Sequence, residues 1–320
     1  MATAYTLEFE KPLQELDRQI EELRRSSAER GTDLSDEITA LEAKLAAQRD
    51  EIYRNLTPIQ RVMVARHSRR PYTLDYLSTI FTDFIELHGD RLFRDDPAIV
   101  GGWARLGGQS VMVIGHQKGR DTKDNLRRNF GMPHPEGYRK ALRLMKLAAR
   151  FGAPVITLID TDGAYPGLGA EERGQSEALA RNILEMSVLP TPIVAIVIGV
   201  GGSGGALALG VADRVLMLEN SIYSVISPEG CAAILWKDAS QRERAAEALK
   251  LTAADLLRLK VIDEIIPEPP GGAHTDHDAT GEAVRDALIR HVNDLRKIKP
   301  DKLVRRRAEK YGAMGAYTEA

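Results

Sequence analysis

A glycine-rich run over residues 199–205 (GVGGSGG) has the composition of a turn that binds a ligand through its backbone. It directly follows the apolar stretch Ile193–Ile198 and precedes a short segment of helical composition. Glycines let backbone N–H groups approach a ligand closely, and a helix N-terminus adds partial positive charge. The run can therefore hold an oxyanion or a phosphate without a reactive side chain, or it can be a purely structural turn.

Two further chemistries fit the same run. Residues 199–204 match the dinucleotide-binding pattern GxGxxG, and Glu219 follows about twenty residues later, as an acid that binds a ribose would, which is typical of an NAD-dependent dehydrogenase. Residues 201–205 also match GxSxG, the nucleophile turn of hydrolases, with Asp263 and His291 downstream in the order that a triad requires. The run alone leaves all of these interpretations open.

A second glycine-bearing turn, Asp160–Gly167 (DTDGAYPG), also lies between an apolar strand, Pro154–Ile159, and a predicted helix. In an α/β sheet, ligands bind beyond the carboxyl ends of neighbouring strands. We therefore expect both turns to open on the same edge of the sheet and to form one pocket with two backbone-lined walls.

Positive charge is concentrated between Lys118 and Arg150, where ten basic residues stand against three acidic ones in a chain of net charge −2. This excess indicates an anionic partner, such as CoA phosphates, an acidic subunit or nucleic acid, and the competing interpretation is a solvated helix face. An aromatic content of 5% argues against a binder of single-stranded nucleic acid. The candidates for contact with an anion such as CoA are Lys118, Arg120, Arg127 and Arg128.

Metal-binding residue types occur in the segment 274–278 (HTDHD), but this segment lies in a proline- and glycine-rich loop that does not fix ligand geometry, so no metal is expected. The single cysteine, Cys231, excludes an internal disulfide and a zinc site of several thiolates. The first residues lack the basic and apolar parts of a signal peptide. These features predict a cytoplasmic protein.

The first part of the chain carries two apolar stripes at helical spacing, within Leu13–Leu23 and Leu34–Leu45, separated by residues 31–33. This pattern predicts a helical hairpin over residues 1–55. The hairpin is too thin to bury its stripes alone, so we expect it to pack on the main body or on another subunit.

The sequence also predicts the helices and strands that position the two turns. A helix is predicted over Thr73–His88 with Gly89 as its left-handed cap, and a β-hairpin around residues 107–108. Strands that are apolar on both faces then alternate with helices, which predicts a covered, largely parallel sheet. The uncharged stretch Met186–Ala212 could span a membrane by length, but its prolines and glycines favour a buried strand, turn and helix.

At these residues the sequence resembles the α-subunit family of bacterial acetyl-CoA carboxylase carboxyltransferases, a branch of the crotonase-like superfamily. The resemblance covers about Leu7 to Ile266. It is carried by the segments 115–145 (GHQKGRDTKDNLRRNFGMPHPEGYRKALRLM), 158–178 (LIDTDGAYPGLGAEERGQSEA), 201–210 (GGSGGALALG) and 221–239 (SIYSVISPEGCAAILWKDA), with PEPPGGAH just after. It implies an α/β fold, a crotonase-like spiral of ββα units over residues 56–266. Beyond it, composition predicts a loop and a helical tail over residues 267–320.

The resemblance also implies a reaction: transfer of a carboxyl group from biotin, carried on a partner protein, to acetyl-CoA, giving malonyl-CoA for fatty acid synthesis. Negative charge would develop on two oxygens. The backbone N–H donors to the biotin ureido oxygen would be Gly204 and Gly205, with Ala206. The other residues lining the carboxybiotin side would be Gly163, Ala164, Gly201 and Gly202.

The partners that the resemblance implies are a β subunit of similar fold, a biotin carboxyl carrier protein and biotin carboxylase, with an α2β2 carboxyltransferase core. The β subunit would bind most of the acyl-CoA and carry a zinc ribbon, so no metal belongs to this chain. One position departs from the family pattern, since Val200 stands where family members tend to have glutamate. No carboxylate role is therefore assigned to this position.

Overall fold

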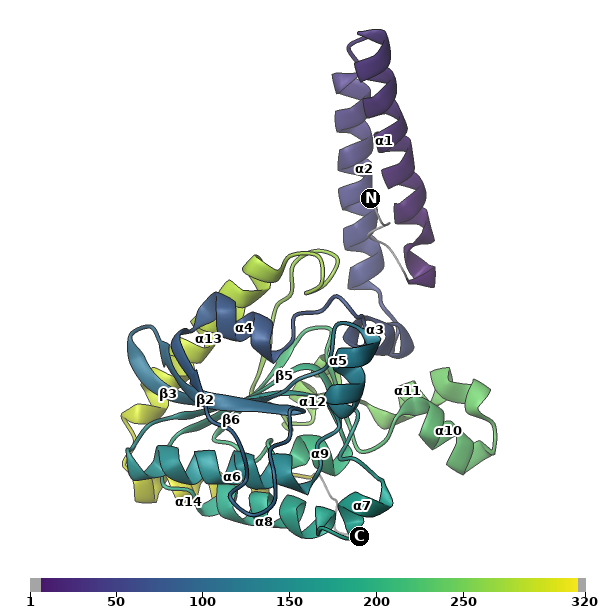
Figure 1. Cartoon of the computed structure of the whole chain (residues 1–320). Coiled ribbons are helices and arrows are strands. Elements are labelled where there is room, and N and C mark those ends of the chain that lie inside the picture. The colour runs from purple at the N-terminus through teal and green to yellow at the C-terminus, as the bar shows by residue number, and fades with distance from the viewer. Residues whose placement is uncertain (1–6, 316–320) are drawn as a thin grey trace.

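The computed structural model describes residues 7–315, and an antiparallel helical hairpin projects from one end of them (Figure 1). Its helices are α1 (Lys11–Arg30) and α2 (Ser35–Arg54), and Gly31 ends α1 with a φ of +64°. The hairpin is confirmed, and its packing on another subunit stays a prediction. The two apolar stripes pack mainly on each other, through Leu13, Leu16, Ile20 and Leu45, so only the base of the arm contacts the body.

One continuous sheet organises the body, in the order β1-β2-β3-β4-β5-β6-β8. The first three strands are antiparallel: β1 (Thr82–Glu86), β2 (Ile99–Leu106) and β3 (Gln109–His116). The remaining strands on this path are parallel: β4 (Val155–Thr161), β5 (Ile193–Gly202), β6 (Arg214–Leu218) and β8 (Glu264–Ile266). The short strand β7 (Ile222–Ser224) pairs with the far end of β5 and so extends the sheet at the glycine-rich run.

The predicted helix over Thr73–His88 is wrong beyond its first half. Helix α4 (Thr73–Ile80) ends at Ile80, and β1 follows at once. The segment 82–86 (TDFIE) contains β-branched and aromatic residues that favour a strand, and it pairs with β2. Gly102 of β2 permits this pairing, because a β-carbon there would collide with the carbonyl of Ile85. Gly89 has a φ of +77°, but it lies in a loop rather than at a helix end.

Helices cover both faces of the sheet (Figure 1). One face packs on α6 (Pro135–Arg150), α8 (Gln175–Val188), α9 (Ser203–Leu207) and α12 (Ala253–Arg258). The other face packs on α4 and α13 (His277–Arg296). The apolar stretch Met186–Ala212 therefore forms the end of α8, the buried strand β5 and α9, and among residues 7–315 no helix is long and apolar enough to cross a membrane.

The remaining helices lie at the edges of this core. They are α3 (Pro58–Ala65), α5 (Thr122–Arg127), α7 (Leu168–Glu171), α10 (Pro228–Trp236), α11 (Arg242–Leu249) and α14 (Pro300–Gly312). The helix predicted after the turn Asp160–Gly167 is split into α7 and α8 because Gly174 between them has a φ of +81°. Helices α10 and α11 form a lobe that stands out from the body (Figure 1).

The C-terminal tail is fixed to the core by one buried arginine. The Arg307 guanidinium donates to both carboxylate oxygens of Asp213, at 3.0 and 2.7 Å, and to the carbonyls of Leu189 and Thr191. Tyr311 then donates from its hydroxyl to the Gly210 carbonyl, at 2.9 Å. The tail thus supports the segment that follows α9.

A second buried ion pair joins the segment before α4 to the loop before α13. Arg70 and Glu268 form two parallel hydrogen bonds, at 2.9 and 2.6 Å, and both side chains are buried. Glu268 also accepts N–H groups from Asn220 and Ala273. Hydrogen bonds therefore hold the segment PEPPGGAH against the core, and it is not a free loop. His274 stacks on another imidazole, and Asp276 caps α13.

Candidate functional site

The two glycine-bearing turns meet at one edge of the sheet, as the sequence predicts. Thr161 at the end of β4 is in register with Gly201 of β5. A β-carbon on Gly205 would lie only 2.6 Å from the amide nitrogen of Ala164 and 2.6 Å from the carbonyl carbon of Gly163. The two turns are therefore in direct backbone contact, and this contact requires glycine at position 205.

The turn at residues 202–205 places backbone N–H groups at the start of α9. Strand β5 runs through Gly202, and Ser203 reverses the chain with a φ of +52°, which is strained for a residue other than glycine. The first amides of a helix have no carbonyl one turn back to bind. Within residues 7–315, no side chain and no carbonyl outside α9 accepts the amides of Gly204 and Gly205. The Ala206 amide is the fourth of the helix and can bond to the Gly202 carbonyl, so it is the weakest of the three candidates.

The facing turn is held by Thr161. Its hydroxyl accepts the Gly163 N–H at 3.1 Å and donates to the Gly163 carbonyl at 2.8 Å. The Gly163 amide is thus occupied, and this residue can only line a wall. A β-carbon on Gly204 would meet only Leu179, at 3.5 Å, and one on Gly163 only Ser203, at 3.8 Å. These two glycines therefore leave open space between the turns.

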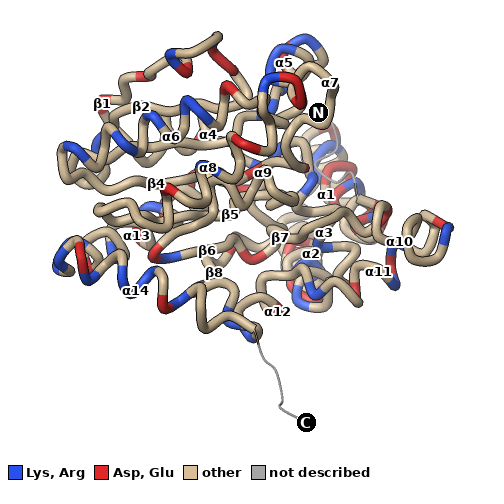
Figure 2. The backbone as a smooth tube through the Cα atoms, turned by 90° about the horizontal axis from the view of Figure 1, so that it is seen from below, with Lys and Arg blue, Asp and Glu red and all other residues tan. Residues whose placement is uncertain are grey.

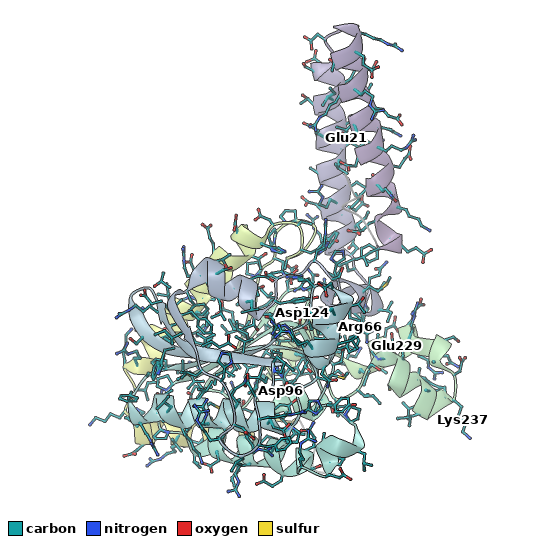
Figure 3. All side chains as sticks on the ribbon, viewed as in Figure 1. Glu21, Arg66, Asp96, Asp124, Glu229 and Lys237 are labelled. Carbon is teal, nitrogen blue, oxygen red and sulfur yellow. The ribbon has the colours of Figure 1, made fainter. Side chains whose placement is uncertain are left out.

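A cleft of about 460 Å³ lies beside this edge. It is lined by Arg66, Asp162, Val200 to Ser203, Ile222 and Ser224 to Ser227. Arg66 forms a bidentate ion pair with Glu229, at 2.9 and 3.2 Å, where α3 meets the α10 lobe (Figure 3). This pair holds the pKa of Glu229 below its usual range. The lining includes Gly201 and Gly202, two of the residues predicted for the carboxybiotin side.

Sequence reasoning missed a buried carboxylate that supports the glycine-rich run. Asp160, near the end of β4, accepts the Val200 N–H at 2.9 Å and the Lys118 ammonium at 2.7 Å through one oxygen. A β-carbon on Gly199 would lie 2.6 Å from that oxygen. Asp160 thereby fixes where β5 turns. The available signal was an aspartate placed directly after a wholly apolar strand.

Val200 lines the cleft, but its side chain is part of the hydrophobic core. Its side chain packs with Val62, Ile222 and Leu251. The position that departs from the family pattern therefore joins β5 to α3 through apolar contact, and no charge is needed there.

The four cationic candidates lie on the segment that follows β3 and are bonded to carboxylates. Lys118 binds Asp160 and Arg120 binds Asp75, while Arg127 and Arg128 both bind Asp124. Burial alone would lower the pKa of Lys118, but Asp160 and Asp162 raise it. Blue and red positions accordingly lie together around α5 (Figure 2). Arg120 and Arg127 stay exposed enough to reach a ligand, with 41% and 55% of their side chains accessible.

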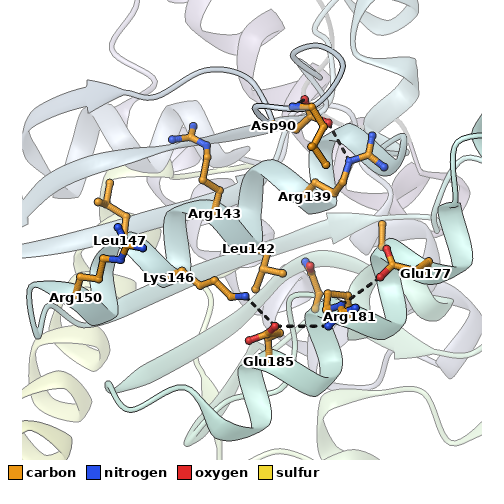
Figure 4. Close-up of a pocket in the computed structure, with 13 residues that line it drawn as sticks. Asp90, Arg139, Leu142, Arg143, Lys146, Leu147, Arg150, Glu177, Arg181 and Glu185 are labelled. Carbon is orange, nitrogen blue, oxygen red and sulfur yellow. Dashed lines mark hydrogen bonds and ion pairs between the residues drawn. The ribbon is translucent and has the colours of Figure 1, made fainter.

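Four other cations of the basic segment line a groove of about 500 Å³ between α6 and α8 (Figure 4), namely Arg139, Arg143, Lys146 and Arg150. Arg139 binds Asp90, and Lys146 binds Glu185 at 2.8 Å. Arg181 on α8 binds Glu177 and lies 3.9 Å from Glu185. Ion pairs within the groove therefore offset much of the positive charge, and the excess counted along the sequence is not a free cationic surface.

The hydrolase interpretation is wrong. Asp263 accepts the Val215 N–H at 2.7 Å and binds Lys310, while His291 binds Glu264 at 2.8 Å. The two predicted triad partners of Ser203 are therefore bonded to other groups, and the predicted triad is not assembled. The dehydrogenase interpretation has no support either. Helix α9 is only five residues long, and Glu219 accepts the Glu268 N–H.

Comparisons with known proteins agree with this geometry. Residues 6–315 match the profile of the family described as acetyl co-enzyme A carboxylase carboxyltransferase-like. The chain is 66% identical over 322 residues to the acetyl-coenzyme A carboxylase carboxyl transferase subunit alpha of Gemmatimonas aurantiaca, with 100% of both chains covered. It is 59% identical over 313 residues to the same subunit of Thermus thermophilus, covering 98% of this chain and 99% of the relative.

Solved structures of lower identity show the same fold. Transcarboxylase 12S with methylmalonyl-coenzyme A and methylmalonic acid bound aligns with a TM-score of 0.55 at 20% identity, over 70% of this chain and 42% of that chain. A Pseudomonas malonate decarboxylase hetero-dimer aligns with a TM-score of 0.56 at 18% identity, over 68% and 89%. These likenesses confirm the crotonase-like α/β fold. Since the family profile spans almost the whole chain and the relatives match along their full length, the chain belongs to the acetyl-CoA carboxylase carboxyltransferase α-subunit family.

Proposed function

We propose that this chain forms the carboxybiotin side of a carboxyltransferase that moves a carboxyl group from biotin to acetyl-CoA, giving malonyl-CoA in the first committed step of fatty acid synthesis. One observation carries the proposal. The amides of Gly204 and Gly205 begin a helix and lack an acceptor outside it, and Gly205 packs against the Gly163–Ala164 turn. Such amides stabilise an oxygen that gains negative charge.

The glycines fit a flat ureido ring. No backbone atom crowds Gly163 or Gly204, where a β-carbon would meet only Ser203 at 3.8 Å or Leu179 at 3.5 Å, and the adjoining cleft reaches Gly201 and Gly202. Carboxybiotin supplies the activated carboxyl group when it is bound. This chain binds the ureido oxygen through Gly204 and Gly205, with Ala206 as a weaker donor, and the Gly163–Ala164 wall orients the ring. Each amide contributes about 3 kcal/mol to stabilising the transition state.

The proposal includes partners. A zinc-containing β subunit of similar fold binds most of the acyl-CoA in an α2β2 assembly, and a biotin carboxyl carrier protein and biotin carboxylase complete the cytoplasmic enzyme. The single, buried and free Cys231 suits a reducing compartment. Arg120 and Arg127, which keep exposed guanidinium groups, are the better candidates for contact with CoA phosphates, whereas Lys118 and Arg128 are more deeply buried.

Reconstitution tests the proposal. The chain and its β subunit are purified separately, and transfer of a carboxyl group from malonyl-CoA to biocytin is measured for each alone and for the mixture. We expect turnover only in the mixture, because the proposed amides bind only one of the two substrates. Full activity of this chain alone would contradict the divided site, and an inactive mixture of folded subunits would contradict the function.

A further inference from the structure

Two buried hydrogen-bond donors converge on Gly205. Tyr138, on α6, is fully buried, and its hydroxyl oxygen lies 2.8 Å from the point where a β-carbon of Gly205 would sit. The hydroxyl therefore packs directly against the α-carbon of the residue that carries the proposed oxyanion amide. His116, the last residue of β3, is also fully buried, and the carbonyl of Gly205 is one of two backbone carbonyls beside its ring.

Neither donor forms a hydrogen bond of ordinary geometry within residues 7–315, although the Gly205 carbonyl lies beside the imidazole. The Tyr138 hydroxyl and the His116 Nε2 are both buried without a hydrogen bond. The Asp160 N–H donates to the His116 Nδ1, at 3.4 Å, which leaves the hydrogen of a neutral ring on Nε2. The ring is neutral near pH 7, because burial lowers the pKa of His116 to about 4 although Asp160 acts in the opposite direction.

An unpartnered buried donor destabilises the folded chain, so its presence requires a reason. The ring of Tyr138 packs against the apolar side chains of Ala164, Ala178, Leu179 and Ala208, and this packing does not require a hydroxyl. Phenylalanine would fill the same space without leaving a hydroxyl unsatisfied. Tyr138 and His116 differ from another buried donor without a partner, the Tyr76 hydroxyl, because both lie beside Gly205.

We propose that Tyr138 and His116 are positioning residues of the Gly205 turn, an inference that rests on the proposed function. Their O–H and N–H dipoles are held beside the backbone whose amides receive the oxyanion. When negative charge develops on the bound oxygen, the O–H dipole of Tyr138 stabilises that charge through the Gly205 turn, and the His116 N–H polarises the Gly205 peptide group. Both groups act through the turn rather than by touching the substrate.

The Tyr138→Phe variant tests this inference, because it removes one oxygen and no packing. In the reconstituted enzyme, kcat falls about tenfold and KM for malonyl-CoA changes by less than about twofold, while the melting temperature of the chain stays the same or rises. Tyr76→Phe is the matched control, since the Tyr76 hydroxyl on α4 is likewise buried and unpartnered. It leaves kcat unchanged and the melting temperature equal or higher.

A second pair of variants tests whether the N–H of the His116 imidazole contributes to kcat. Glutamine at position 116 can accept the Asp160 N–H and still offer an N–H donor, whereas methionine offers neither. We expect His116→Gln to retain most of kcat and His116→Met to lose at least about tenfold. An unchanged kcat in Tyr138→Phe, a lowered melting temperature in that variant, or equal losses in the two His116 variants would overturn the inference. Inactivity of the wild-type assembly would instead overturn the proposed function.

Discussion

The Gly205→Ala variant is expected to lower kcat of the assembled enzyme by roughly 100- to 1,000-fold, the loss seen when one oxyanion donor is displaced. The added β-carbon would lie 2.6 Å from the amide nitrogen of Ala164 and from the carbonyl carbon of Gly163. Both are backbone atoms that cannot rotate away. The two turns must therefore separate, and the Gly205 amide moves out of register with the bound oxygen. Transfer from malonyl-CoA to biocytin measures the loss.

Two variants in the same turn are its controls. Gly204→Ala keeps the N–H and places its β-carbon in space where only Leu179 is near, at 3.5 Å, so kcat falls less than about tenfold. Ser203→Ala removes a hydroxyl that has no base partner, and kcat stays within about threefold of wild type. Equal activity in Gly205→Ala and wild type would contradict the account, and an inactive Ser203→Ala variant would restore a serine nucleophile.

The largest stability effect is expected at Glu268. The Glu268→Gln variant keeps the shape of the side chain but leaves the buried Arg70 guanidinium without a counter-charge, which lowers the free energy of unfolding by about 3–5 kcal/mol. Burial alone would raise the pKa of Glu268, but Arg70 and the donors around the carboxylate hold it at about 2, against 4.5 as the reference value. The pair therefore contributes its full stability above the reference pKa and loses it as pH falls toward the folded pKa.

Denaturant unfolding as a function of pH measures both parts of this prediction. Wild type loses stability steadily between about pH 5 and pH 3, and the variant loses less over the same interval because it has no carboxylate to protonate. Glu21→Gln is the control, since Glu21 lies exposed on the arm (Figure 3) and its removal changes stability by less than about 0.5 kcal/mol. Parallel acid transitions in wild type and Glu268→Gln would contradict the assignment.

Periodic features of the sequence predicted much of the fold. The arm follows from apolar residues at helical spacing, and the turn at residues 107–108 follows from its glycine pair. Strands β4 and β5 follow from continuous apolar runs, because both of their faces are buried. The end of α4 did not, since TDFIE is compatible with a helix until its pairing with β2 is known. Strand β7 is too short to have a period of its own, and only the far end of β5 defines it.

The two backbone turns of the candidate site could be predicted from the sequence. The distant side chains that support these turns could not. Glycines at 163, 201, 202, 204 and 205 pointed to two turns on one edge. The bonds of Asp160 to Lys118 and of Arg70 to Glu268 join residues 42 and 198 positions apart, and no local pattern encodes such pairs. The charge count over residues 118–150 misled for the same reason, because several of the neutralising carboxylates lie on other segments.

Replacement of one backbone amide by an ester tests the central claim most directly. Glycolic acid introduced at position 205 deletes the N–H and changes neither side chain nor packing. The account predicts that kcat for transfer from malonyl-CoA to biocytin falls roughly 100-fold or more, while the same replacement at the open hairpin residue Gly108 leaves kcat unchanged. An ester at position 205 that turns over at the wild-type rate would show that this amide does not carry the chemistry.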